Sequence, residues 1–175
     1  MGDGVLDHRQ TNGLVADQVN ATLGSECIAN GNFQGDASLW DQTDAKFSID
    51  ETNDYASYAD GVDGSLIQLD GDNLVSIVAS KIYKIQFTIS GGSGDARVHL
   101  YSYNHNHHLL AEATYADGFH TVYALSPSPY EGGFVIRGKT QGSAFNITDV
   151  SVKEVTGNPG VLVSFDGTDF KTDTP

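Results

Sequence analysis

The sequence has 175 residues, with 9 Lys and Arg against 23 Asp and Glu, and its formal net charge is -14. This acidity argues against nucleic acids and anionic membrane surfaces as partners, because proteins bind both mainly through basic side chains. The single cysteine, Cys27, excludes an internal disulfide and any zinc site that needs two thiolates. The length suits one domain with a hydrophobic core.

The negative charge is concentrated in the first part of the chain. Residues 1–72 hold 14 acids and 2 bases, whereas residues 73–175 hold 9 acids and 7 bases. A bound cation or a basic partner is therefore expected at the N-terminal part of the molecule.

The first 29 residues are polar with scattered Val and Leu, and we assign them to an N-terminal arm. The run at 13–24, GLVADQVNATLG, suits either a short helix or an extended arm. The opening residues lack the apolar stretch of a secretory signal, and no segment is apolar for long enough to form a membrane helix. We therefore expect neither feature.

From about residue 46 to residue 155, short segments alternate between apolar and polar residues, with Gly and Asp turn residues between them. This pattern predicts half-buried antiparallel strands and an all-β sandwich. In one central strand, the alternation places Tyr83, Ile85, Phe87 and Ile89 on the core face. The predicted strands lie at 46–50, 65–70, 81–90, 96–103, 119–125 and 144–155.

The pattern is interrupted at 156–160, TGNPG, and we assign residues 156–175 to a C-terminal arm. Within it, VLVSF at 161–165 is expected to form one more strand. Two arrangements fit such arms: they pack on their own domain, or they find a partner on a neighbouring subunit.

Three segments of residues 30–155 form a recognisable set. They are NGNF at 30–33 followed by Trp40, YKIQFTIS at 83–90 followed by GGSG, and ITDVSVKEV at 147–155. Together they resemble the carbohydrate-binding-module type of jelly roll. The resemblance implies a jelly-roll β-sandwich at 30–155, flanked by the N-terminal arm at 1–29 and the C-terminal arm at 156–175.

Modules with this ending are also similar to parts of tailed-bacteriophage virion proteins, where they serve in tail fibres or as head or tail decorations. The resemblance implies a virion structural protein, made in the host cytoplasm and attached through its arms to capsid or tail proteins. A homo-oligomer is expected with it, a trimer being favoured. The alternative is a glycan-binding module that recognises a cell-surface polysaccharide.

The resemblance also suggests a sugar site. Aromatic faces stack on sugar rings, and planar polar groups bind hydroxyls. Tyr101 and Tyr103 share one face of a predicted strand and Asn104 follows them, so these three are the candidate carbohydrate-binding residues. Tyr is also a common packing residue in strands. Trp40 belongs to the N-terminal motif and is expected in the core.

The resemblance implies one structural calcium ion between the N-terminal motif and the last strand. Carried over by position, the candidate ligands are Asn32, Asp36 and Asp149, whose oxygen donors suit Ca2+. Thr148 stands where the family often has an acid, which counts against the site. The acids between residues 60 and 72 are a second candidate, although Asp-Gly is the ordinary hairpin turn. No other cofactor is expected.

His105, His107 and His108 lie close together in the sequence. Three imidazoles suit Zn or Ni, but Asn-His-Asn-His between two strands is more typical of an exposed hairpin tip. The sequence has no nucleophile elbow, P-loop or metalloprotease motif, so we do not expect an enzyme.

Overall fold

The structure is a computed structural model, and it describes the strands of a sandwich, many of their connections and a pair of two-residue strands, one near each end of the chain. These described residues contain no helix that is long and apolar enough to cross a membrane. The chain divides into two compact units, one of Gly24–Glu154 and one of Met1–Leu23 with Val155–Pro175. The described residues are 14–15, 22–41, 46–59, 63–68, 75–92, 96–101, 108–130, 133–138, 143–157 and 163–164.

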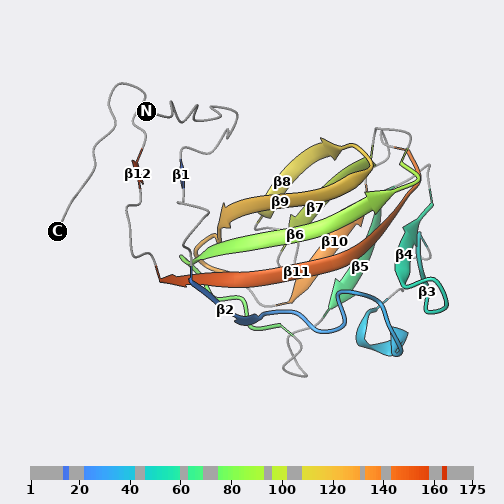
Figure 1. Ribbon diagram of the computed structural model, residues 1–175, viewed down its shortest axis with the longest axis horizontal. Helices are drawn as coiled ribbons and strands as arrows, with labels where there is room; N and C mark the ends of the chain where they lie inside the picture. Colours follow the sequence, from blue (N-terminus) through green and yellow to red (C-terminus); the bar gives the residue numbers. More distant parts are fainter. Residues whose placement is uncertain are drawn as a thin grey trace, which may run out of the picture. The chain divides into compact units, whose positions relative to one another are not determined.

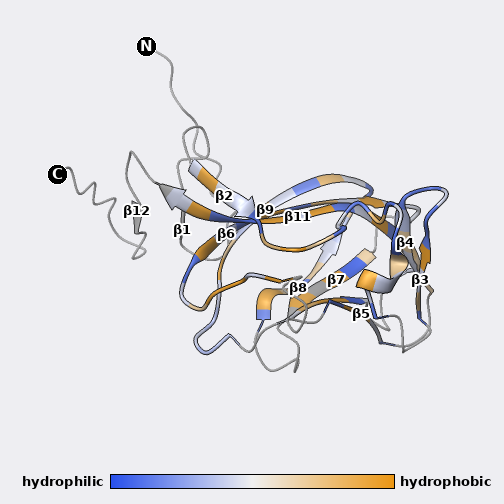
Figure 2. Cartoon of the chain, turned by 90° about the horizontal axis from the view of Figure 1, so that it is seen from below, coloured by the Kyte–Doolittle hydropathy of each residue, from blue (hydrophilic) through white to orange (hydrophobic). Residues whose placement is uncertain are grey.

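In the described part of the sandwich, two antiparallel sheets pack face to face around one core (Figures 1 and 2). The all-β jelly-roll β-sandwich predicted from the sequence is confirmed. The large sheet has the order β3-β4-β11-β6-β9, with β2 paired to β11, and comprises β2 (Thr22–Glu26), β3 (Phe47–Asp50), β4 (Tyr55–Tyr58), β6 (Ile82–Ser90), β9 (Gly118–Leu125) and β11 (Phe145–Gly157). The small sheet has the order β5-β10-β7-β8 and comprises β5 (Gly64–Gln68), β7 (Ala96–Tyr101), β8 (His108–Tyr115) and β10 (Phe134–Gly138).

Strand β6 shows how the sequence alternation builds the core. Tyr83, Ile85, Phe87 and Ile89 are at most 1% exposed, whereas the residues between them are half-buried. The strand lies between β11 and β9 in the large sheet. The predicted core face is therefore confirmed, because every second side chain of a strand points to the same side of its sheet.

Aromatic side chains fill the core at the N-terminal motif. Trp40 is 2% exposed and follows a short 3-10 helix, η1 (Ala37–Leu39). Its ring centroid lies 5.4 Å from that of Phe33 and 6.4 Å from that of Phe134, and its Nε1 donates to the carbonyl oxygen of Asn30 at 3.0 Å. The prediction that Trp40 is a core residue is confirmed.

The last long strand, β11, is bent by an irregularity between Thr148 and Ser151, where its register with β6 shifts. Asp149 within this bulge has a φ of 52°. The next residue, Val150, is buried, and its backbone N–H donates to the carbonyl oxygen of Gly31 at 2.8 Å. The N-terminal motif and the last strand are thus joined directly.

Each predicted strand coincides at least in part with an observed one, but β2, β4, β8 and β10 were not predicted. Strand β10 is buried at most positions, so its sequence lacks alternation. Strand β8 carries mostly exposed residues. Both patterns depend on tertiary contacts, which decide strand formation more strongly than local preference.

The second unit contains described residues of both arms. The rest of the described N-terminal arm belongs to the sandwich, because β2 pairs with β11 and Cys27 and Ile28 are buried in its core. Leu14–Val15 forms β1, which pairs antiparallel with β12 (Val163–Ser164). In this register Leu14 stands opposite Ser164, and Val15 stands opposite Val163. Within the described residues, the run at 13–24 is therefore extended, and the strand expected at 161–165 is present as β12.

Candidate functional site

The outward surface of the small sheet is the candidate ligand surface. Its core-facing residues, such as Leu66, Val98 and Ile136, alternate with side chains that point away from the core. We call this surface the arginine face and define it by Ser65, Ile67, Arg97, Val135 and Arg137.

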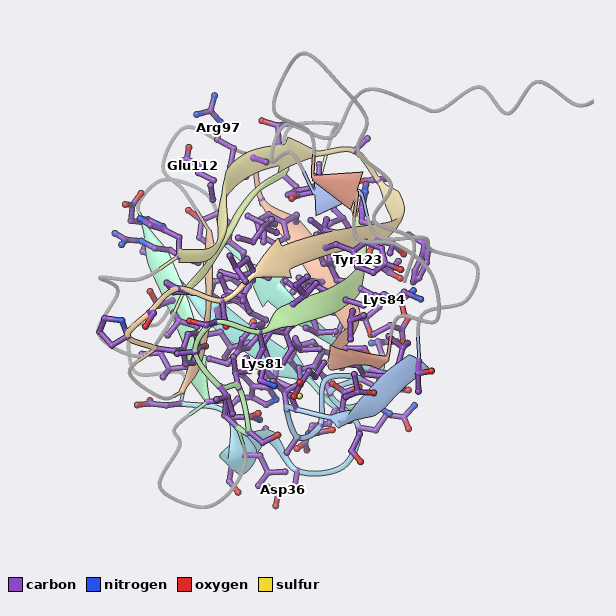
Figure 3. The ribbon with its side chains drawn as sticks, turned by 90° about the vertical axis from the view of Figure 1, so that its left-hand side faces the viewer. Asp36, Lys81, Lys84, Arg97, Glu112 and Tyr123 are labelled. Atoms are coloured by element: carbon purple, nitrogen blue, oxygen red, sulfur yellow. The ribbon has the colours of Figure 1, made fainter. Side chains whose placement is uncertain are left out.

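Two ion pairs cross the arginine face. Arg137 Nη2 lies 2.7 Å from Asp63 Oδ2, and Arg97 Nη1 lies 3.2 Å from Glu112 Oε1. Figure 3 shows Arg97 and Glu112 close together at the border of the sandwich. The four side chains are between 26% and 34% exposed. Their guanidinium and carboxylate groups are therefore both held in place and accessible.

Arginine is scarce in this chain, which makes the placement informative. The sequence has three arginines, and two of them, Arg97 and Arg137, lie on this face, while Arg9 lies outside the described residues. A guanidinium is a planar fork of donors that suits pairs of oxygen atoms. The face therefore offers paired donors and acceptors of fixed geometry.

An apolar row runs beside the ion pairs. Ile67 of β5 stands opposite Val135 of β10, and Val135 stands opposite Tyr101 of β7. Ile67 is half-buried and Val135 is fully buried. Because Val135 has no exposed surface, only Ile67 of these two side chains can contact a ligand.

Of the three predicted carbohydrate-binding residues, the structure describes only the backbone of Tyr101. It is the last residue of β7, on a strand of the arginine face. Tyr103 and Asn104 lie outside the described residues, as do His105 and His107. His108 begins β8, opposite Tyr101, and is exposed. A sugar site at Tyr101, Tyr103 and Asn104 stays a prediction.

The predicted calcium ligands Asn32, Asp36 and Asp149 are all exposed. Asp36 caps η1, and the hydrogen bonds from the Ser38 side chain and backbone lower the pKa of its carboxyl group. Asn32 Oδ1 accepts from the Gln34 backbone N–H at 3.4 Å, and Asp149 Oδ2 accepts from Thr88 Oγ1 at 3.5 Å.

Each candidate calcium ligand thus has a local structural partner. Among the described residues, no group of three or more His, Cys, Asp or Glu side chains is placed to hold a metal ion. Calcium binding at Asn32, Asp36 and Asp149 stays a prediction from the resemblance, and of the second candidate only Asp63 lies within the described residues.

Sequence reasoning missed the arginine face. Arg97 and Arg137 are 40 positions apart, and only the pairing of β7 with β10 brings their strands together. In the sequence, Arg97 and Arg137 each follow an apolar residue within a β-rich segment. This alternation predicts that both side chains point away from the core, but it does not show which strands lie beside each other.

No protein-family model and no curated protein matches the sequence. Among solved structures, the enzymatically active domain of tailspike protein 4 from bacteriophage CBA120 is similar, with 11% identity and a TM-score of 0.47 over 74% of this chain. The match spans only 21% of the tailspike chain.

Two binding modules are similar over nearly their whole length. A structure described as "CBM4 structure and function" has 17% identity and a TM-score of 0.46, covering 73% of this chain and 99% of its own. The N-terminal cellulose-binding domain of Cellulomonas fimi β-1,4-glucanase C has 13% identity and a TM-score of 0.46, covering 76% and 99%. At low identity, the structural neighbours of this chain are thus carbohydrate-binding modules and a domain of a phage tailspike.

Proposed function

We propose that the chain is a structural protein of a bacteriophage virion, a capsid decoration or a tail or fibre accessory, built on a carbohydrate-binding-like jelly roll and attached through its arms. The observation that carries the proposal is the pairing of the arms, because β1 and β12 belong to a different compact unit from Gly24–Glu154. The described residues at the ends of the chain pair through two two-residue strands, and so short a pair is marginally stable at best in water. Contacts with other virion proteins or with sister subunits, three in the favoured assembly, would stabilise it.

Breaking the arm pair is expected to abolish incorporation into particles without unfolding the sandwich. The double substitution Val15→Asp with Val163→Asp places two carboxylates opposite each other in the register, where like charges repel. Particles assembled with the variant should contain little of it, as measured by quantitative mass spectrometry of purified virions. The thermal midpoint of the sandwich should change by less than about 3 °C, because no core residue is altered.

Val78→Asp is the matched control for this experiment. Val78 is an apolar residue of the first unit that is 55% exposed, so the same change there should leave incorporation intact. Normal incorporation of the arm variant would contradict attachment through the arms.

A second function, glycan binding, is favoured by the arginine face. Its two ion pairs fix planar donors and acceptors, with the half-buried Ile67 on the same face, and such donors and acceptors suit the hydroxyls of a sugar. The ligand class would be a cell-surface polysaccharide, with Tyr101, Tyr103 and Asn104 as further candidate contacts.

Arg137→Lys tests this function. The substitution keeps the positive charge beside Asp63 but replaces the planar guanidinium, with its paired N–H donors, by an ammonium group. Affinity for neutral oligosaccharides that the wild type binds on a glycan array should fall about tenfold, the cost of one hydrogen bond to a charged group. The control, Lys81→Gln, alters an exposed lysine outside the arginine face and should leave affinity unchanged. Unchanged affinity in Arg137→Lys, or no glycan bound by the wild type, would remove this second function.

A further inference from the structure

The outward surface of the large sheet places two lysines side by side. Lys84 of β6 stands directly opposite Lys153 of β11, and Tyr123 of β9 stands directly opposite Lys84 on its other side. Figure 3 shows Lys84 and Tyr123 as neighbours. All three residues are half-buried. We call these three residues the lysine row.

Two lysines in this position are unfavourable for the protein alone. Directly opposed residues on one face have Cβ atoms about 5 Å apart, and like charges at this spacing destabilise the sheet. The chain has 23 acids for 9 bases, so carboxylates to pair with lysine are abundant. Lys81 has such a partner, with its Nζ 3.1 Å from Glu154 Oε1. Within the described part of the chain, no carboxylate forms an ion pair with Lys84 or Lys153.

The acids nearest in the sheet have other roles. The carboxylate of Glu26 accepts three hydrogen bonds, from Ser151 Oγ and the Val152 N–H at 2.6 Å each and from the Cys27 N–H at 3.2 Å. Asp149 lies beside Thr88. Thr88 is four positions from Lys84 along β6, a separation of roughly 13 Å. Neither acid forms an ion pair with Lys84 or Lys153.

The groups around the lysines suit a sugar chain. Burial raises the pKa of Tyr123, so its hydroxyl remains a neutral donor and its ring adds no negative charge at physiological pH. Two residues farther along β6, Gln86 stands opposite Thr121 of β9. Its Nε2 donates to Thr121 Oγ1 at 3.1 Å, which fixes an amide beside a hydroxyl. Farther along β9, Phe119 is 62% exposed. Aromatic rings and amide or hydroxyl groups on a sheet surface are typical contacts for sugar rings and their hydroxyls.

We propose that the lysine row binds an acidic polysaccharide, with Lys84 and Lys153 holding its carboxylates and Tyr123 contacting a sugar ring. The charge complementarity gives the ligand class, and the neighbouring ring, amide and hydroxyl favour a sugar over an acidic peptide. The lysine row is on the large sheet and the arginine face is on the small sheet, so each site can be tested without the other.

The test compares the wild type with the double variant Lys84→Gln and Lys153→Gln, using polygalacturonate as the probe and isothermal titration calorimetry as the readout. The variant should bind at least about tenfold more weakly, since two charge-assisted hydrogen bonds are lost. Raising the salt from about 0.05 to about 0.5 M should weaken wild-type binding, because salt screens exposed charges. Lys81→Gln, which removes an exposed lysine from an ion pair, is the matched control and should bind like the wild type.

The unliganded double variant gives an independent readout. Because the substitutions relieve repulsion, it should melt at the same temperature as the wild type or higher, whereas a structural role would lower its melting temperature. Equal polygalacturonate binding by variant and wild type, or a lower melting temperature of the variant, would overturn the proposal. Tighter binding of poly-L-glutamate than of polygalacturonate would also overturn it, in favour of an acidic protein. Loss of neutral-glycan binding in Arg137→Lys with polygalacturonate binding intact would affect only the arginine face.

Discussion

Replacing Gly31 with alanine is expected to destabilise the sandwich by about 3 kcal/mol or more, the upper range for forcing extra atoms into a packed site. A Cβ at this position would overlap the carbonyl oxygen of Val150. The obstacle is backbone rather than a flexible side chain, so it cannot move without disturbing β11. The Val150 N–H also donates to the Gly31 carbonyl oxygen at 2.8 Å. Moving the two backbones apart to admit the Cβ would weaken this hydrogen bond.

Gly35→Ala is the matched control for Gly31→Ala. Gly35 has a φ of 87°, but a Cβ there would have no heavy atom within 4 Å. Only backbone strain remains, at a cost of about 1–2 kcal/mol. Urea unfolding, followed through the fluorescence of the single tryptophan, Trp40, measures both variants. If Gly31→Ala is no less stable than Gly35→Ala, the close approach of the N-terminal motif to β11 is wrong.

Trp40→Ala should have the second large effect, a loss of about 3–5 kcal/mol in the free energy of unfolding. The indole is 2% exposed and lies between Phe33 and Phe134, so its removal leaves a cavity between the two sheets. The substitution also leaves the carbonyl oxygen of Asn30 without the indole N–H that donates to it at 3.0 Å. Unfolding is followed by far-UV circular dichroism, because the fluorescent residue is removed.

Two further variants separate the contributions at Trp40. Trp40→Phe keeps much of the apolar volume and should be clearly milder than Trp40→Ala, although it too loses the hydrogen bond. Phe119→Ala removes an aromatic ring that is 62% exposed and should change stability by less than about 0.5 kcal/mol. A tolerated Trp40→Ala would mean that Trp40 is a surface residue and not part of the core.

The core was predictable from sequence wherever burial has a period of two. The apolar positions of β6, Tyr83 to Ile89, alternate without a break, and each one is buried. Trp40 was recognised as a core residue through the motif that contains it. Strands β8 and β10 lack this period, because β10 is buried at most positions and β8 is mostly exposed, and their formation depends on pairing with distant strands.

The two candidate surfaces depend on register, which the sequence did not reveal. Alternation predicted that Lys84 points away from the core, but not that Lys153 stands opposite it. That pairing depends on the bulge between Thr148 and Ser151, since a shift of one residue would turn the strand over. Arg97 and Arg137 also come onto one face through strand pairing rather than sequence spacing, with Arg137 opposite His99, two residues from Arg97.

The central claim is that the arms attach the chain to a virion and leave the sandwich to present its sheet surfaces. A cryo-EM map of the native particle that carries the protein tests this most directly. We predict density for Leu14–Val15 and Val163–Ser164 buried against another virion protein or a sister subunit, with the arginine face and the lysine row open to solvent. Arms projecting into solvent, with either sheet surface buried against the shell or tail, would contradict the claim.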